Sequence, residues 1–447
     1  MTFALAPHGR PHQARPAFAS LIALACVLTF GTHSAVAQDS NGRLADVEKR
    51  LDASLQLIAQ LTQRLAQLEG KVAPAAAVAA SPPAPDKAMA ARLNELEQQV
   101  AAIANPPDED RGLALHGFAD VGWVRSSRGR ANGAYVGGMD FYMTPSFGDR
   151  VKSLIELNFE VMPDGGVGVD LERLQLGYIA SDALTLWLGR FHTPYGYWNN
   201  AFHHGAQLQT SVLRPRFLDF EDLGGILPAH SVGAWGTGGV KLGVGRLGYD
   251  VYLSNAPLIG VGSGAAGSGV LDMRQAGTPD RRMMIGGNLS FSLNGAREGL
   301  SVGAHTLHGR VADDAASGAH LTQLNMTGLW AAFTDHGYEF MGELYRFNNR
   351  DLSGGSGTHK STASYVQFGR ELGKFTPFVR WEKTALNQAD AYFAHQASGQ
   401  SYKRVALGLR WELNSKTALK FEADRTTLTD RDVGTYTEFR SQLAVRF

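Results

Sequence analysis

The sequence has a single cysteine, no net charge and no long apolar run after its N-terminal segment. Cys26 lies in an N-terminal apolar stretch that we expect to be cleaved off, and a lipid-modified Cys26 is the alternative. The mature chain then has neither a disulfide bond nor a thiolate nucleophile. Lys and Arg together number 42, as do Asp and Glu, so bulk charge does not favour nucleic-acid binding.

The N-terminal segment, residues 1–37, has the pattern of a secretory signal peptide. Arg10 and Arg15 precede an apolar run over 18–30, and small residues occupy 35–37. A membrane anchor is the alternative, but the run is well short of the roughly 20 residues that a transmembrane helix needs. An exported chain without such a helix is either soluble or crosses a membrane as a β-barrel.

Enzyme motifs are also missing. The sequence contains no GxSxG, HExxH, P-loop or Rossmann fingerprint. We therefore expect no enzyme activity, no catalytic residue and no cofactor.

Residues 38–70 are predicted to form a coiled coil. Apolar residues recur at heptad spacing, which is typical of a helix that buries its stripe against other copies. The two core positions hold Leu44, Leu51, Ile58 and Leu65, and Val47, Leu61 and Leu68. A single amphipathic helix packed on the rest of the protein is the alternative. A Pro- and Ala-rich linker (71–87) and a second short helix (88–105) follow.

After Leu113, apolar and polar residues alternate along the chain. Ile155, Leu157 and Phe159, for example, alternate with Glu156 and Asn158, so one face of the segment is apolar and the other polar. Such segments run to about 10 to 13 residues, against about 5–6 for strands of soluble sheets. This length favours a transmembrane β-barrel over 113–447.

Sixteen such segments are predicted, an even number as bacterial barrels require. They lie near 113–126, 132–146, 151–162, 169–181, 184–193, 231–243, 245–255, 281–293, 300–311, 321–335, 337–348, 360–372, 374–386, 403–414, 417–428 and 437–447. Alternate connections are tight turns, and the intervening ones are longer, notably 194–230, 256–280 and 387–402. This is the order expected of periplasmic turns and external loops. The predicted fold is therefore an all-β, 16-stranded antiparallel transmembrane barrel preceded by a short coiled coil.

Charged residues of both signs fall on the polar faces, which would line the lumen. The basic ones are Lys152, Arg173, Arg380, Arg404, Arg410, Lys420, Arg440 and Arg446, and the acidic ones Asp120, Asp140, Glu156, Glu160, Asp250, Glu382, Glu412, Glu422 and Asp424. Because the signs nearly balance, selectivity depends on which charges lie at the narrowest point.

The third long connection, 194–230, is a candidate constriction loop. An exposed loop of this length without secondary structure of its own is unusual unless it has a function. Candidate constriction residues in and beside it are Arg190, His192, His203, His204, Arg214, Arg216, Asp219, Glu221 and Asp222.

Strand count, loop order and the C-terminal Phe447 make residues 113–447 resemble trimeric outer-membrane porins, in which the third loop narrows the barrel. With the N-terminal coiled coil, the chain resembles DcaP-like dicarboxylate-type porins and, more distantly, the phosphate-selective porins O and P. The resemblance implies a homotrimer, three separate pores and uptake of small, often anionic solutes. The chain lacks the heavily basic third loop expected of a phosphate-selective pore.

Two interpretations of Arg214 and Arg216 remain open. They face the lumen and meet carboxylate or phosphate groups, or they pair with Asp219, Glu221 and Asp222 and brace the loop. The histidines His192, His203, His204 and His230 form no recognised metal-binding pattern, so no metal is expected. Tyr195, Tyr197 and Trp198 are predicted to pack the loop against the wall or to belong to the external aromatic girdle, with a sugar-stacking platform as the alternative.

The predicted function is a porin for small hydrophilic solutes with mild anion preference. The alternatives are a structural tether or adhesion protein anchored by a barrel, and a saccharide-selective porin. Expected partners are two further copies of the chain, outer-membrane lipid and lipopolysaccharide, and the barrel assembly machinery, which would recognise the strand ending in Phe447. Peptidoglycan is a further candidate partner of the coiled coil. The predicted location is the outer membrane, with the coiled coil in the periplasm.

Overall fold

The computed structural model describes most of the chain after residue 114. The described residues are 115–128, 132–145, 147–161, 166–202, 205–221, 223–261, 269–273, 277, 281–294, 299–314 and 319–447. They belong to one compact unit, Pro107–Phe447. The predicted signal peptide, coiled coil, linker and second helix lie outside the described residues, as do His203, His204 and Asp222.

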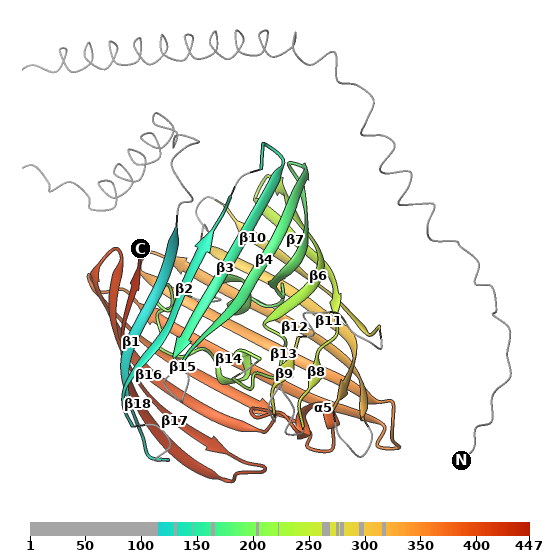
Figure 1. Cartoon of the computed structure of the whole chain (residues 1–447). Coiled ribbons are helices and arrows are strands. Elements are labelled where there is room, and N and C mark those ends of the chain that lie inside the picture. The colour runs from blue at the N-terminus through green and yellow to red at the C-terminus, as the bar shows by residue number, and fades with distance from the viewer. Residues whose placement is uncertain are drawn as a thin grey trace, which may run out of the picture. The chain divides into compact units, whose positions relative to one another are not determined.

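Sixteen long strands form the wall among the described residues. They are β1 (His116–Ser126), β2 (Gly133–Met143), β3 (Val151–Val161), β4 (Val167–Ser181), β5 (Leu184–His192), β6 (His230–Leu242), β7 (Gly245–Asn255), β10 (Met283–Leu293), β11 (Leu300–Asp313), β12 (Leu321–Asp335), β13 (Tyr338–Asp351), β14 (Thr358–Arg370), β15 (Phe375–Ala385), β16 (Tyr402–Asn414), β17 (Thr417–Leu428) and β18 (Gly434–Arg446). Each pairs antiparallel with its neighbours, and β18 pairs with β1. The predicted 16-stranded antiparallel barrel is confirmed, and Figure 1 shows its tilted strands.

Five short elements lie in the connections and were not predicted. They are α4 (Trp198–Ala201), the 3-10 turn η1 (Arg216–Leu218), β8 (Leu258–Ile259), β9 (Leu271–Asp272) and α5 (Ala391–Ala394). β8 pairs with β9 and, in parallel, with the end of β11, so neither adds a strand to the wall. Each spans at most four residues, which is too short for a sequence period to reveal.

The β13–β14 hairpin is longer than predicted. β13 continues to Asp351 and β14 begins at Thr358. The Asp351 carboxylate accepts hydrogen bonds from the backbone N–H groups of Ser353, Gly354 and Ser356, and so closes the turn between them. This local hydrogen bonding holds polar residues in strand conformation beyond the apolar alternation.

The two faces of the wall have opposite character. Leu344, Trp381 and Leu407 are about half exposed on the outer face, whereas Arg380 and Glu422 are buried on the inner face. An apolar exterior around a polar interior is typical of a barrel that crosses a membrane.

Aromatic pairs lie on the outer face at the end with the tight turns. Tyr338 contacts Phe368, and Phe375 contacts Trp411. Phe447 contacts Phe141 edge to face, and its backbone exchanges hydrogen bonds of 3.1 Å with Gly117 of β1. These rings resemble the aromatic girdle of membrane barrels.

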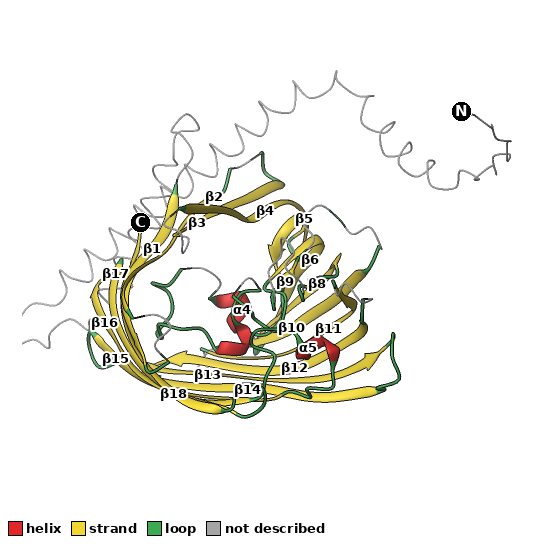
Figure 2. Ribbon diagram, turned by 60° about the horizontal axis from the view of Figure 1, so that its bottom comes forward, coloured by secondary structure: helices red, strands yellow, loops and turns green. Residues whose placement is uncertain are grey.

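The connection between β5 and β6, residues 193–229, is here called loop 3, and its described residues lie inside the barrel (Figure 2). Figure 2 shows α4 and neighbouring loop segments within the ring of strands. No helix in the described part of the chain is long and apolar enough to span a membrane.

Candidate functional site

Loop 3 enters the barrel at a turn that requires glycine. Gly196 has φ = +63°, and a Cβ at this position would overlap the Glu343 carboxylate and the Tyr345 hydroxyl. Its N–H donates to His305 Nδ1 at 3.1 Å. The chain therefore passes close to the wall at a point where no side chain would fit.

Glu343 of β13 holds the start of α4. Its carboxylate accepts hydrogen bonds from the backbone N–H groups of Tyr197 (3.0 Å) and Trp198 (2.7 Å). The hydroxyls of Tyr345 and Tyr365 donate to the same carboxylate at 2.7 and 2.8 Å. Four donors compensate for burying this group, so wall and loop are joined by a satisfied polar cluster.

Aromatic packing reinforces this attachment. Trp198 is fully buried and packs edge to face against Tyr365, while Tyr195 stacks on His305. The rings of Tyr195 and Trp198 thus hold loop 3 to the wall and leave no open face on which a sugar could stack. Tyr197 is half-buried and packs against Trp330.

The centre of loop 3 is bound by Arg380 of β15. Its guanidinium donates to the Leu213 carbonyl (2.8 Å), to Ser211 Oγ (2.9 Å) and to the Arg214 carbonyl (3.4 Å). It also forms ion pairs with Glu382 at 2.9 Å and Glu422 at 3.3 Å. Arg380 is 0% exposed, so its planar donors serve the loop rather than an open lumen.

Other wall groups bind the loop backbone in the same way. Lys420 donates to the Ala206 and Ser211 carbonyls, and Arg410 to the Gln207 and Gln209 carbonyls. Carboxylates and one hydroxyl accept from the loop N–H groups: Glu422 from Val212 and Leu213, Glu382 from Arg216, and Tyr402 from Phe217. Counting Arg380, five charged side chains and one hydroxyl on the inner face of β15–β17 therefore fix loop 3.

A buried polar cluster closes the end of loop 3 against β4–β6. His230 lies between two carboxylates, with Nδ1 2.6 Å from Glu221 and Nε2 2.8 Å from Glu172. Glu172 also pairs with Arg190 at 3.2 Å. Burial opposes ionisation of Glu221, but the charge and hydrogen bond of His230 outweigh it and lower the pKa of this carboxyl.

Arg214 and Arg216 differ in their environments. Arg214 is 7% exposed, donates to Asn199 Oδ1 at 3.1 Å and lies 4.0 Å over the Phe220 ring. Burial lowers the pKa of its guanidinium and raises that of the Asp219 carboxyl. Arg216 is half-buried, and its Nη1 donates to the Tyr436 hydroxyl at 3.1 Å. Arg216 is thus the more accessible of the two arginines.

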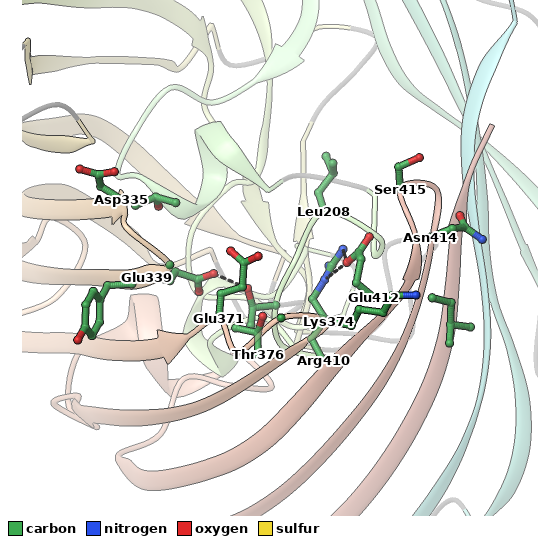
Figure 3. A pocket seen from close by; sticks show the side chains of 16 residues that line it. Leu208, Asp335, Glu339, Glu371, Lys374, Thr376, Arg410, Glu412, Asn414 and Ser415 are labelled. Atoms are coloured by element: carbon green, nitrogen blue, oxygen red, sulfur yellow. Dashed lines mark hydrogen bonds and ion pairs between the residues drawn. The ribbon is translucent and has the colours of Figure 1, made fainter. Parts of the chain in front are cut away.

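A cavity of about 670 Å³ lies beneath loop 3 near the tight turns. Leu208 and Thr210 of the loop line it on one side. Figure 3 shows charged side chains of both signs around it, among them Glu339 of β13, Lys374 of the β14–β15 turn and Arg410 of β16. Acidic and basic side chains therefore both line this water-accessible space.

Ion pairs also cover parts of the wall away from the loop. Arg173 pairs with Glu156, and Arg440 with Asp424 and Glu438. In the Arg173–Glu156 pair the arginine is 23% exposed and the glutamate 2%; Arg440 is 18% exposed against 1% for Asp424. The arginine is thus the more accessible member of both pairs.

The remaining predicted residues are scattered. Arg404 is buried between Asp424 and Glu382, and Lys152 is exposed on β3. His192 lies with Nε2 3.7 Å from Glu156. Among the described residues, no three His, Cys, Asp or Glu side chains are arranged to hold a metal ion.

Three residues in the polar contacts around loop 3 were not singled out from the sequence, and each lies on a wall strand. Glu343 and His305 bind loop 3 directly, whereas Glu172 contacts His230 of β6. For each of these residues, a position on the polar face of its strand was the only signal in the sequence. Because Glu343 and Trp198 are 145 residues apart, no local pattern reveals their contact.

No model of a known protein family matches the chain, and no curated protein matches it by sequence. Among solved structures, an anion-selective porin from Comamonas acidovorans is similar with a TM-score of 0.51 at 14% identity, covering 75% of this chain and 99% of that one. OmpF of Salmonella typhi in complex with daunomycin is similar with a TM-score of 0.51 at 10% identity, covering 76% of this chain and 98% of that one.

The outer membrane channel DcaP of Acinetobacter baumannii matches with a TM-score of 0.48 at 11% identity, covering 75% of this chain and 97% of that one. That score is too low to support a conclusion about this chain. Identities this low reveal the fold alone. The described part of the chain has the fold of a porin-like outer-membrane β-barrel.

Proposed function

We propose that the protein is an outer-membrane porin that lets small hydrophilic solutes diffuse passively. The observation that carries this proposal is a closed barrel with a polar inner face, to which a long loop inside the barrel is fixed by hydrogen bonds. Loop 3 makes hydrogen bonds to β11, β13, β15, β16 and β17, so the narrowed passage has a defined shape. A barrel of sixteen strands is wide enough to keep an aqueous channel beside such a loop.

The proposed assembly is a homotrimer in the outer membrane, each subunit having its own pore. The apolar outer face supports the membrane location. The predicted coiled coil over 38–70 supports self-association, because its stripe needs a partner helix. Recognition of the strand ending in Phe447 by the assembly machinery and contact with peptidoglycan remain predictions.

Anion preference is proposed to be weak and to depend on Arg216. Arg173 and Arg440 are more accessible than the carboxylates that they pair with, which favours anions. Asp170, whose side chain is 54% exposed, opposes this effect. We expect Arg216→Ala to lower the anion-to-cation permeability ratio about two- to threefold, because a half-buried charge is only partly screened by salt. The reversal potential in a KCl gradient measures this ratio.

Arg214→Ala is the matched control for Arg216→Ala. Its guanidinium is buried, so its removal alters loop packing more than the field in the passage. An unchanged reversal potential in Arg216→Ala would rule out the role given to this residue.

Liposome swelling tests the proposed function as a whole. Proteoliposomes that hold the full-length protein are expected to swell in small sugars, amino acids and dicarboxylates, at rates that fall steeply with solute size. Absence of swelling by correctly folded protein would contradict a porin and favour a structural tether. Equal rates for a large and a small sugar would contradict the narrowing by loop 3.

A further inference from the structure

The outer face of β13–β17 has a group of basic residues near the strand ends opposite the tight turns. The six residues of this basic belt are Arg346, Arg350, Lys360, Lys383, Lys403 and Arg425. All are exposed, and each lies within the last six residues of its strand at the end away from the tight turns. The apolar band formed by Leu344, Val366, Trp381, Val405 and Leu407 follows toward the turns.

The belt has no acidic counterpart. The structure describes β13–β17 completely. Leaving aside the last residue of each strand, every Asp and Glu on these strands lies at a position that faces the barrel interior. Glu343, Glu382 and Asp424, for example, are buried there. None of the six basic side chains forms an ion pair or hydrogen bond within the described residues. By contrast, Arg380 and Arg404 on the inner face of β15 and β16 pair with carboxylates.

Strand pairing forces like charges together in this belt. Lys383 and Lys403 are direct register partners of β15 and β16. Such partners have Cβ atoms about 4.5–5.5 Å apart, and like charges at this spacing destabilise a sheet. An anion bound between the two ammonium groups would remove the repulsion.

A hollow over β13–β15 is lined by further basic residues of the belt. It has a volume of about 590 Å³, and Arg346 and Lys360 line it together with Thr362 and Ala385. Thr362 is the register partner of both Arg346 and Ala385, so the hollow crosses three strands. A guanidinium, an ammonium and a hydroxyl around small residues can accept a phosphate group.

We propose that the basic belt binds the phosphate groups of a phosphorylated lipid of the outer membrane leaflet, whose acyl chains cover the apolar band. The apolar band directly beside the belt favours a lipid over a free anion, because headgroup and chains are then contacted together. This inference rests on the membrane location proposed above.

Binding of lipid A to the full-length protein in phosphatidylcholine nanodiscs tests the proposal. The variant is Arg346→Gln/Lys360→Gln/Lys383→Gln/Lys403→Gln, and the matched control is Lys416→Gln, an exposed lysine at a tight turn. We expect the fourfold variant to bind diphosphorylated lipid A at least about tenfold more weakly than the wild type. The control and a fourfold variant that exchanges Lys and Arg at the same positions should bind as the wild type does.

Two comparisons identify the ligand. Lipid A without phosphates should bind the wild type as weakly as diphosphorylated lipid A binds the fourfold variant. Inorganic phosphate, at the same concentration as diphosphorylated lipid A, should not displace that lipid from the wild type. Equal binding of diphosphorylated lipid A by wild type and variant would overturn the proposal, as would full competition by inorganic phosphate. Ion conductance of the variant should equal that of the wild type, so a non-conducting protein would refute the porin proposal independently of lipid binding.

Discussion

Arg380→Met is expected to release the centre of loop 3 and to destabilise the barrel. Met keeps a flexible, unbranched side chain, although a shorter one, and offers no donors. The substitution removes hydrogen bonds to Ser211 and Leu213 and leaves Glu382 and Glu422 buried without their main cation. Breaking one side of a buried ion pair typically costs about 3–5 kcal/mol of unfolding free energy.

Two measurements follow this change. The thermal unfolding midpoint in detergent should fall, and single-channel recordings should show larger, fluctuating currents because the loop no longer keeps one position. Arg125→Met is the matched control, since Arg125 is exposed on the outer face of β1 and should behave as the wild type does. A variant of Arg380 with the wild-type midpoint and quiet currents would contradict the anchoring role.

Gly196→Ala is expected to displace α4 from the wall. A side chain at φ = +63° is strained by about 1–2 kcal/mol, and here the added methyl group would also overlap the Glu343 carboxylate and the Tyr345 hydroxyl. Relief of the overlap requires loss of the hydrogen bonds from Tyr197 and Trp198 to Glu343. Both a lower unfolding midpoint and altered conductance should result.

Gly373→Ala separates the two contributions. Gly373 has φ = +67° in a tight turn, but nothing lies within 4 Å of the position that its Cβ would take. It therefore reports the backbone strain alone, without the overlap. If Gly196→Ala were no more harmful than Gly373→Ala, the close fit of loop 3 against β13 would be disproved.

The barrel itself could be predicted from sequence because its determinant is local. Each strand alternates between lipid and lumen, so Ile155, Leu157 and Phe159 already reveal a half-buried strand. Strand ends were less predictable, because the extension of β13 to Asp351 depends on side-chain hydrogen bonds in the turn. The short elements α4 and α5 depend on packing inside the barrel.

The roles of the lumen residues could not be predicted in the same way. The alternation of polar and apolar residues along a strand indicates which side chains face inward. It does not reveal whether water, solute or a loop contacts those side chains. Arg380 and Lys420 were expected to line an open lumen, yet loop 3 covers both. Their partners, such as Leu213, lie more than 160 residues away in sequence, so the contacts arise only when the barrel closes.

The central claim is that loop 3 lines the passage, and chemical modification of Leu208→Cys tests it most directly. Leu208 is 41% exposed and borders the cavity beneath the loop. A membrane-impermeant charged thiol reagent should lower the single-channel conductance of this variant stepwise, and should leave Gly355→Cys in the β13–β14 turn unaffected. Unchanged conductance of Leu208→Cys, with complete modification verified by mass spectrometry, would contradict the account.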